Sequence, residues 1–306
     1  MTAAAESGSR WRHLRRAALT RVKILLLVCL TATFLAHLLL TLSPGGLSAA
    51  QGSSRPVTGY FIWLWGVLRL DLGFTNRGLP VESVVAHGLA VTVPLLAGAI
   101  LTSVVSALGP VLLRLSRSGR AVGLGLGQLV LLVSFIPVVL LGYFIVLYWV
   151  HRFGEVPSLG LAGSSPMRAA SAVLLPALVL GLGDGTAAEL LGLTRVLVRE
   201  GIKLPFVQAV RAKGASIPRH LFRYLLGPMV ASVLGRIPLL LGGAIVVESV
   251  FTLPGIGFLT WRAAAERDAP LIMGVTLVLV LASELAVGLG DILFSALDPR
   301  AREGRA

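Results

Sequence analysis

Hydrophobic residues run along this chain in long blocks that short polar stretches separate. Six blocks are long enough to cross a lipid bilayer, and they cover approximately 23–43, 90–113, 125–150, 170–193, 225–250 and 271–296. A transmembrane helix needs about 20 predominantly apolar residues. Lipid offers the backbone no hydrogen-bond partner, so each block is predicted to be helical. The pattern predicts an all-α integral membrane protein with six transmembrane helices.

The composition supports this class of protein. Of the 306 residues, 56% are hydrophobic and 13% are charged, with a net charge of +13. Soluble domains carry about 25% charged residues. A nucleic-acid-binding protein displays its basic residues on a hydrophilic face, whereas here they form short clusters between apolar blocks. We therefore expect the chain to lie in a lipid bilayer and to bind no nucleic acid. The single cysteine, Cys29, excludes an intramolecular disulfide.

The basic residues also predict the topology. Nineteen Lys and Arg lie in the N-terminus, the second and fourth connections and the tail, against seven on the opposite side. The positive-inside rule then places both termini in the cytoplasm of a multi-pass protein of the cell (inner) membrane. The predicted regions are a basic N-terminus (1–22), a retained first helix (23–43), an outer loop (44–85), a core of five helices (86–298) and a cytoplasmic tail (299–306).

The outer loop has two parts. Residues 44–56, PGGLSAAQGSSRP, have the composition of a loop. Residues 60–73, YFIWLWGVLRLDLG, are apolar but too short to span, so we expect them to lie at the membrane interface. The alternative is an unstructured loop with isolated aromatic residues.

The fourth connection, 195–223, contains the polar stretch FVQAVRAKGASIPRH at 206–220. Residues 206–213 are good helix formers. Gly214 suits the left-handed position after a helix, and Ser216 suits the cap of the next one. The stretch therefore predicts a short helix, a sharp turn and a second helix on the cytoplasmic side.

Two interpretations of this short helix are compatible with the spacing. Ala209 and Ala212 share one face and present little bulk, which suits docking into a groove of another protein. A basic loop that only fixes the topology would carry the same charges.

The stretch resembles the coupling segment, or EAA loop, of ABC importer permeases. More narrowly, the chain is similar to the first permease subunit of the dipeptide/oligopeptide/nickel importer family. The likeness covers about 60–300. The matching motifs are Arg69-Leu-Asp-Leu-Gly, Leu193-Thr-Arg, Glu200, Phe206-Val, Arg211-Ala-Lys-Gly, LLGGAIVVESVFTLPGIG (240–257), Asp268-Ala-Pro and Leu297-Asp-Pro-Arg.

This resemblance implies a type I ABC importer permease (MetI-like) architecture. The chain would conduct peptides or related small solutes such as nickel complexes. The resemblance does not identify which of these solutes is transported. Its partners would be a second permease subunit in a heterodimer, two ABC ATPase subunits or domains and an extracytoplasmic solute-binding protein. The segment inserted into the ATPase would comprise Gln208, Ala209, Arg211, Ala212, Lys213, Gly214 and Ser216.

The ATPase is expected on other polypeptides. No G-x-x-x-x-G-K-[ST] phosphate loop occurs in the chain. We therefore expect it to be no enzyme and to bind no cofactor, with ATP and Mg used by the partner subunits. The chain departs from the family pattern at Gln208 and Val210, at Pro228 and Pro238, and in a first outer loop about thirty residues shorter than usual.

Charged residues inside the apolar blocks are candidates for the solute pathway. Each costs about 2.5–3.5 kcal/mol in lipid, so such residues usually face a cavity or a partner. The candidates are Asp184, Glu189, Arg236, Glu248, Glu284 and Asp291. Of these, Asp184, Arg236, Glu248 and Glu284 are assigned to the pathway. Arg236 and Glu248 would line or brace the pathway; interhelical pairing or snorkelling to the interface is the alternative. Pro254, Gly255 and Gly257, in TLPGIG, would belong to an outer gate.

Two other classes of function remain open from the sequence. A proton-coupled secondary transporter would use Asp184, Glu189 or Glu284 as a relay. An intramembrane enzyme would need converging acids, but Asp184 and Glu189 are five residues apart and match one helical face imperfectly. Dependence of uptake on ATP or on the proton gradient discriminates between the two modes of transport.

Overall fold

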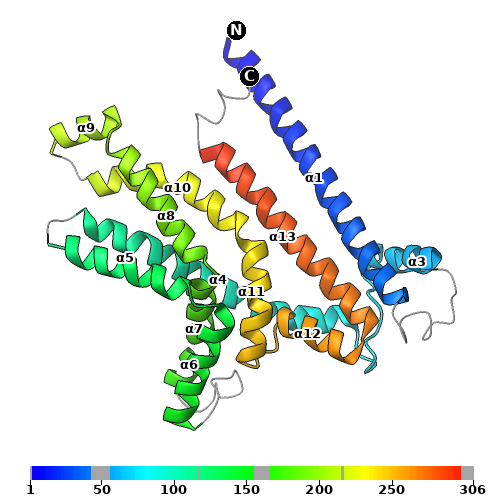
Figure 1. The fold of residues 1–306 in the computed structure, drawn as a ribbon. Helices are drawn as coiled ribbons and strands as arrows, with labels where there is room; N and C mark the ends of the chain where they lie inside the picture. Colours follow the sequence, from blue (N-terminus) through cyan, green and yellow to red (C-terminus); the bar gives the residue numbers. More distant parts are fainter. Residues whose placement is uncertain (1, 43–55, 116–117, 155–165, 215–216, 298–306) are drawn as a thin grey trace. The chain divides into compact units, whose positions relative to one another are not determined.

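The computed structural model in Figure 1 describes residues 2–42, 56–115, 118–154, 166–214 and 217–297. The predicted loop at 44–55, Ser216 and the tail at 299–306 lie outside these ranges. Regular structure in the described residues is helical apart from an isolated bridge between Phe74 and Pro80. The helices are α1 (Thr2–Leu42), α3 (Pro56–Leu68), α4 (Val81–Arg114), α5 (Arg120–Ser134), α6 (Val138–Phe153), α7 (Pro166–Gly183), α8 (Thr186–Gly201), α9 (Pro205–Ala212), α10 (Ile217–Gly235), α11 (Ile237–Val250), α12 (Ile256–Glu266) and α13 (Ala269–Leu297).

Three helices are long and apolar enough to span a membrane by themselves. They contain the candidate spans Leu19–Leu42, Val81–Leu113 and Ala269–Phe294. The second begins at Val81 and not near residue 90, because α4 starts directly after Pro80. The first and last predicted blocks are each a single unbroken helix long and apolar enough to span.

The other three predicted spans are each broken into two helices. The bends between the halves are 101° for α5 and α6, 58° for α7 and α8, and 50° for α10 and α11. The prediction of continuous helices over 125–150, 170–193 and 225–250 is therefore wrong. By length and composition, the described residues contain up to six candidate spans if each bent pair counts as one.

Local backbone chemistry explains these breaks. Pro137 precedes α6 with φ −52° and ψ 136°, and its missing N–H prevents α5 from continuing. Gly185 precedes α8 with φ +86°, a left-handed conformation that glycine adopts without a steric penalty. Arg236 lies between α10 and α11, and Pro238 occupies the first turn of α11.

At the break between α7 and α8, serine hydroxyl groups donate hydrogen bonds to carbonyl groups at the end of α7. The Ser103 hydroxyl of α4 donates to the Gly181 carbonyl at 2.7 Å, and the Ser134 hydroxyl of α5 donates to the Leu182 carbonyl at 3.0 Å. Both carbonyls lie in the last turn of α7, where a helix leaves carbonyl groups without intrahelical partners. These bonds make a broken helix tolerable in lipid.

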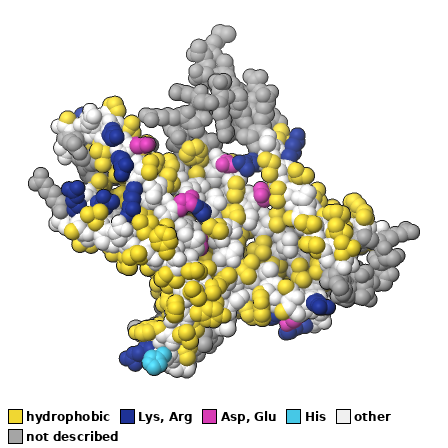
Figure 2. Space-filling view, in the orientation of Figure 1, with side chains coloured by type: hydrophobic (Ala, Val, Ile, Leu, Met, Phe, Trp, Pro, Cys, Tyr) yellow, Lys and Arg dark blue, Asp and Glu magenta, His cyan; other side chains and the backbone are white. Residues whose placement is uncertain are grey.

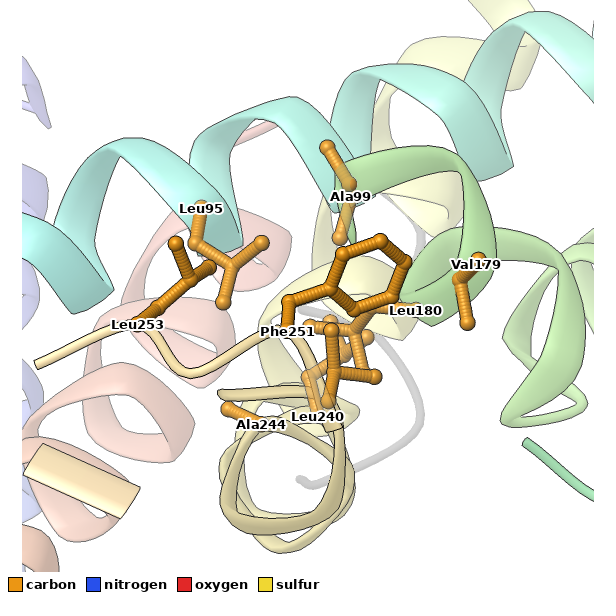
Figure 3. Packing of buried hydrophobic residues seen from close by; sticks show 10 residues of the cluster. Leu95, Ala99, Val179, Leu180, Leu240, Ala244, Phe251 and Leu253 are labelled. Atoms are coloured by element: carbon orange, nitrogen blue, oxygen red, sulfur yellow. The ribbon is translucent and has the colours of Figure 1, made fainter. Parts of the chain in front are cut away.

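The chain divides into two compact units, Met1–Val84 with Ala263–Gly288, and Val85–Arg262 with Leu289–Ala306. Two hydrophobic clusters form the core of the second unit. One joins α4, α7 and α11 around Phe251 (Figure 3). The other joins the later part of α4 to α8 and α10 through Ala107, Leu190 and Leu225. The continuous helix α4 is thus the support for both halves of the broken spans.

In the first unit, the short helix α3 packs on α1 through Tyr60. The Tyr60 hydroxyl donates to the Leu30 carbonyl at 3.1 Å and lies 3.0 Å from the Thr33 hydroxyl. The opposite side of α3 exposes large apolar side chains, including Phe61 and Trp65. The segment expected at the interface is therefore an apolar helix of 13 residues, too short to span. The alternative of an unstructured segment is wrong over Pro56–Leu68.

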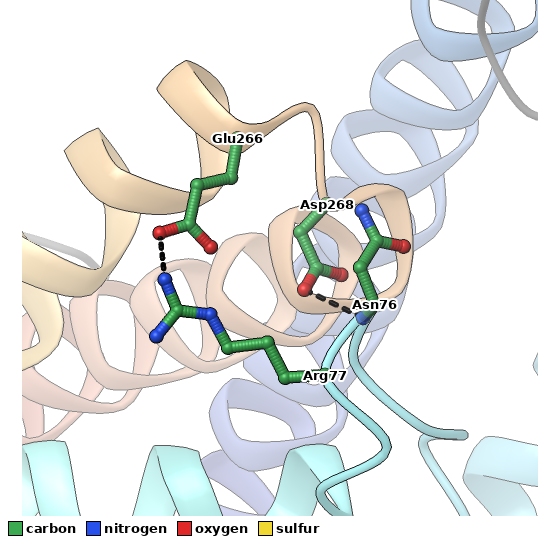
Figure 4. Close-up of polar contacts among 4 residues, drawn as sticks. All are labelled: Asn76, Arg77, Glu266 and Asp268. Atoms are coloured by element: carbon green, nitrogen blue, oxygen red, sulfur yellow. Dashed lines mark hydrogen bonds and ion pairs between the residues drawn. The ribbon is translucent and has the colours of Figure 1, made fainter.

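A second contact in the first unit fixes the segment before α4 (Figure 4). The buried Asp268 carboxylate accepts the Asn76 N–H at 2.9 Å and the Leu271 N–H, in the first turn of α13, at 3.2 Å. Arg77 forms an ion pair with Glu266 at 2.5 Å. Asp268 of the Asp-Ala-Pro motif therefore caps α13 and holds the turn before α4.

Candidate functional site

The short helix α9 lies between α8 and α10, at the point where the polar stretch predicts a helix. Pro205 provides its first residue, a position at which the missing proline N–H costs little. Val207 is only 1% exposed and anchors the helix. Gln208, Ala209 and Ala212 are exposed, so the small-residue face is accessible. The backbone of Arg211 also belongs to α9.

A left-handed glycine follows α9. The Lys213 N–H donates to the Ala209 carbonyl at 3.1 Å and closes the last turn, and Gly214 then has φ +66°. An added Cβ at Gly214 would meet no atom within 4 Å, so the backbone conformation and not space restricts this position. The predictions of a short helix here and of a left-handed conformation at Gly214 are confirmed.

Three charged residues meet where two broken spans bend. Glu189 of α8 forms an ion pair with Arg236, at the break between α10 and α11. Arg236 also interacts electrostatically with Asp184, which lies at the break between α7 and α8. The Asp184 carboxylate accepts the Thr186 N–H at 3.0 Å and the Thr186 hydroxyl at 2.5 Å, and so caps α8.

These charges are partly accessible. The side chains of Arg236 and Glu189 are 27% and 47% exposed, although both lie within candidate spans. On the face shown in Figure 2, acidic and basic side chains adjoin each other within a largely hydrophobic surface. Charges at membrane depth that are exposed on an isolated chain usually face a water-filled cavity or a partner.

Glu248 has a different environment from the other charged candidates. Its side chain is fully buried, at 0% exposure. One carboxylate oxygen accepts the Thr92 hydroxyl at 2.7 Å, and the other accepts the Phe258 N–H at 3.0 Å. The Thr92 hydroxyl in turn accepts the Ile256 N–H at 2.8 Å. Glu248 and Thr92 thus satisfy the first turn of α12, where backbone N–H groups and the helix dipole favour an anion.

Two glycines let the TLPGIG turn approach this carboxylate. A Cβ at Gly255 would overlap the Glu248 carboxylate, and a Cβ at Gly257 would lie 2.5 Å from the Ile245 Cα atom. Both glycines are buried, whereas Pro254 is exposed. The turn is held tightly against α11 and leaves no room for a side chain at either glycine.

The structure brings some predicted residues together and separates others. Asp184 and Arg236 interact, while Glu248 belongs to the separate group with Thr92. Glu284 lies on α13 in the other compact unit and is partly buried. Sequence analysis missed Thr92, whose partner Glu248 is 156 residues away, and it named Glu189 as a candidate without its ion-pair partner Arg236. The glycine before α8 was the available signal that Asp184 and Glu189 flank a bend.

Comparison with known proteins identifies the family. Residues 99–303 match the family described as the inner membrane component of binding-protein-dependent transport systems. The chain belongs to this family. The match covers most of the chain, including every helix from α5 to α13. The resemblance to ABC importer permeases is thereby confirmed, and with it an all-helical, multi-pass membrane protein that serves transport.

Individual proteins named as permeases of transport systems are also similar to this chain. A protein of Brucella abortus, provisionally named a peptide transport system permease protein, is 33% identical over 250 residues, which is 78% of each chain. The oligopeptide transport system permease protein OppB of Salmonella typhimurium is 28% identical over 80% of each chain. The oligopeptide transport system permease protein AppB of Bacillus subtilis is 34% identical over a shorter region, which is 42% of this chain and 41% of AppB.

Proposed function

We propose that this chain is a permease subunit of an ATP-driven importer for peptides or related small solutes. It couples separate ATPase subunits to a membrane pathway that opens alternately to the two sides. The observation that carries this proposal is the exposed face of α9, ended by a left-handed glycine at the tip of two packed helices. The names of the relatives support peptides as the solute, and nickel complexes are a second class to be tested.

The surface of α9 suits a groove in another protein. Ala209 and Ala212 present only methyl groups, so a partner can approach the helix closely, and Lys213 and Gln208 provide polar contacts at the rim. The sequence contains no phosphate loop of its own. We assign this groove to an ATPase subunit that binds ATP and Mg, and the segment from Gln208 to Ser216 to the coupling contact.

The remaining partners follow from this architecture. A second permease, in a heterodimer, would complete the pathway, two ATPase subunits or domains would drive it, and an extracytoplasmic binding protein would deliver the solute. Both termini and α9 would lie in the cytoplasm at the inner membrane, as the distribution of basic residues predicts.

The charged residues receive different roles in this proposal. Asp184 and Arg236, with Glu189, would face the pathway, because they are partly exposed within bent spans. Glu248 would brace the outer gate formed by Pro254, Gly255 and Gly257, because its carboxylate is buried against that turn. Glu284 would contribute to the pathway from α13.

Uptake into proteoliposomes tests the proposed function. The chain is reconstituted with its second permease, ATPase subunits and binding protein, and labelled di- to pentapeptides or nickel complexes are offered outside. We expect uptake that requires ATP at the ATPase side and persists when the proton gradient is dissipated. Uptake that ignores ATP and stops with the loss of the gradient would establish the proton-coupled alternative, which the family does not favour.

A further inference from the structure

Helices α8 and α10 are the two arms of a hairpin whose tip is α9. Leu190 and Val198 of α8 pack in one cluster with Leu221 and Leu225 of α10. Near the tip the arms are in close contact, since a Cβ at Gly201 would lie 2.6 Å from the Leu221 Cδ1 atom. A displacement of α9 therefore acts on both arms.

Each arm ends at a break in its span, at the end away from α9. The arm α8 begins after Gly185, and the arm α10 ends at Gly235, directly before Arg236. Beyond the breaks the chain continues in α7 and α11, which pack on each other. A Cβ at Gly243 of α11 would lie 2.7 Å from the Leu180 Cδ1 atom of α7. The chain thus enters and leaves the hairpin at two bends that adjoin the same pair of helices.

The ion pair between Glu189 and Arg236 joins the arms at this end. Glu189 lies in the first turn of α8, and Arg236 is the residue at the second bend. The apolar cluster holds the arms along their length, but at the bends the charged pair spans from one arm to the other. Losing either charge would remove this link between the arms at the bends.

We infer that the Glu189–Arg236 pair positions the two arms so that the α8–α9–α10 hairpin moves as one body about the bends at Gly185 and Arg236. A displacement of α9 would then reach α7 and α11 together. Hinges of this kind are a few residues at the ends of elements that absorb the change in φ and ψ. The inference rests on the proposed function, in which α9 receives the movement of the ATPase.

Neutral variants test this inference in the reconstituted transporter. In Glu189→Gln, Arg236→Gln and the double variant, we expect ATP hydrolysis to continue while uptake per ATP falls by about tenfold or more. The double variant should be no worse than either single variant, because all three remove the same interaction. Glu82→Gln, at an exposed glutamate of α4, is the matched control and should transport normally. Uptake per ATP within twofold of the unmodified chain in Glu189→Gln would overturn the inference.

A distance measurement tests the pair independently of transport. Spin labels at the exposed positions Val196 of α8 and Leu226 of α10 report the separation of the arms. We expect one narrow distance distribution, unchanged by nucleotide, that broadens in Glu189→Gln. A distribution that is equally narrow in Glu189→Gln would overturn the positioning role. If the unmodified transporter shows no ATP-driven uptake, the proposed function fails, but this comparison still decides the role of the pair.

Discussion

The substitution Gly214→Val is expected to abolish uptake while the transporter still assembles in the membrane. Gly214 has φ +66°, and an L-residue in the left-handed conformation costs roughly 1–2 kcal/mol, more when it is β-branched. An added Cβ would meet no atom within 4 Å, so the cost lies in the backbone conformation and turning the backbone would relieve it. That change would redirect α9 relative to α10 and remove it from the ATPase groove.

The measurement compares ATP-driven uptake with the amount of assembled complex. A cost of 1.4 kcal/mol corresponds to about tenfold in the population of the correct turn, so we expect uptake to fall by at least about tenfold. Gly125→Val is the control. Gly125 of α5 is exposed, has no atom within 4 Å of an added Cβ and lacks a positive φ. Equal uptake in the two variants would contradict the role assigned to the Gly214 turn.

The substitution Glu248→Ala is expected to destabilise the protein strongly. Removing the buried carboxylate leaves the Thr92 hydroxyl and the Phe258 N–H without their acceptor. A buried donor left unpaired costs about 1–3 kcal/mol. We expect a lower thermal unfolding midpoint for the purified transporter and a loss of uptake, with Glu248→Gln intermediate because one acceptor oxygen is kept. Glu82→Gln should leave the midpoint unchanged.

A double-mutant cycle gives this prediction a sharper form. Gly255→Ala alone would place a methyl group on the Glu248 carboxylate, and overpacking of this kind costs about 1–3 kcal/mol. In the Glu248→Ala background the carboxylate is gone, so the same methyl group should cost much less. Strictly additive effects on the free energy of unfolding would contradict the contact between this carboxylate and the TLPGIG turn.

The sequence predicts the unbroken helices and the polar tip well. Hydropathy identifies α1 and α13 because each contains an apolar stretch of spanning length in one unbroken helix, and the local preferences of Gly214 predict its turn. The breaks escape such analysis for a physical reason. Pro137 ends a helix, yet Pro94, Pro110 and Pro176 lie inside helices, so a proline alone does not reveal a break.

The environments of the charged residues depend on contacts between distant parts of the chain. Hydropathy treats Glu248 and Arg236 alike, as charges inside an apolar block. Only the fold shows that Glu248 is enclosed by Thr92 and the first turn of α12, while Arg236 reaches Glu189 at an accessible bend. The helix α12 was not predicted at all, because it begins at Ile256, inside the TLPGIG stretch that sequence analysis treated as a gate segment.

Cross-linking from α9 tests the central claim most directly. Cysteine replaces Ala209, an exposed small residue on α9, and Cys29 is replaced by serine, so that a reagent with one thiol-reactive end and one photoreactive end attaches to this chain at one place. In membranes that contain the whole transporter, we expect the reagent to cross-link α9 to the ATPase subunit. The yield of this product should differ between the ATP-bound and ATP-free states. A cysteine at Glu82, also exposed but predicted on the outer side, should capture no ATPase. Failure of the Ala209→Cys chain to capture the ATPase in any nucleotide state would contradict the account.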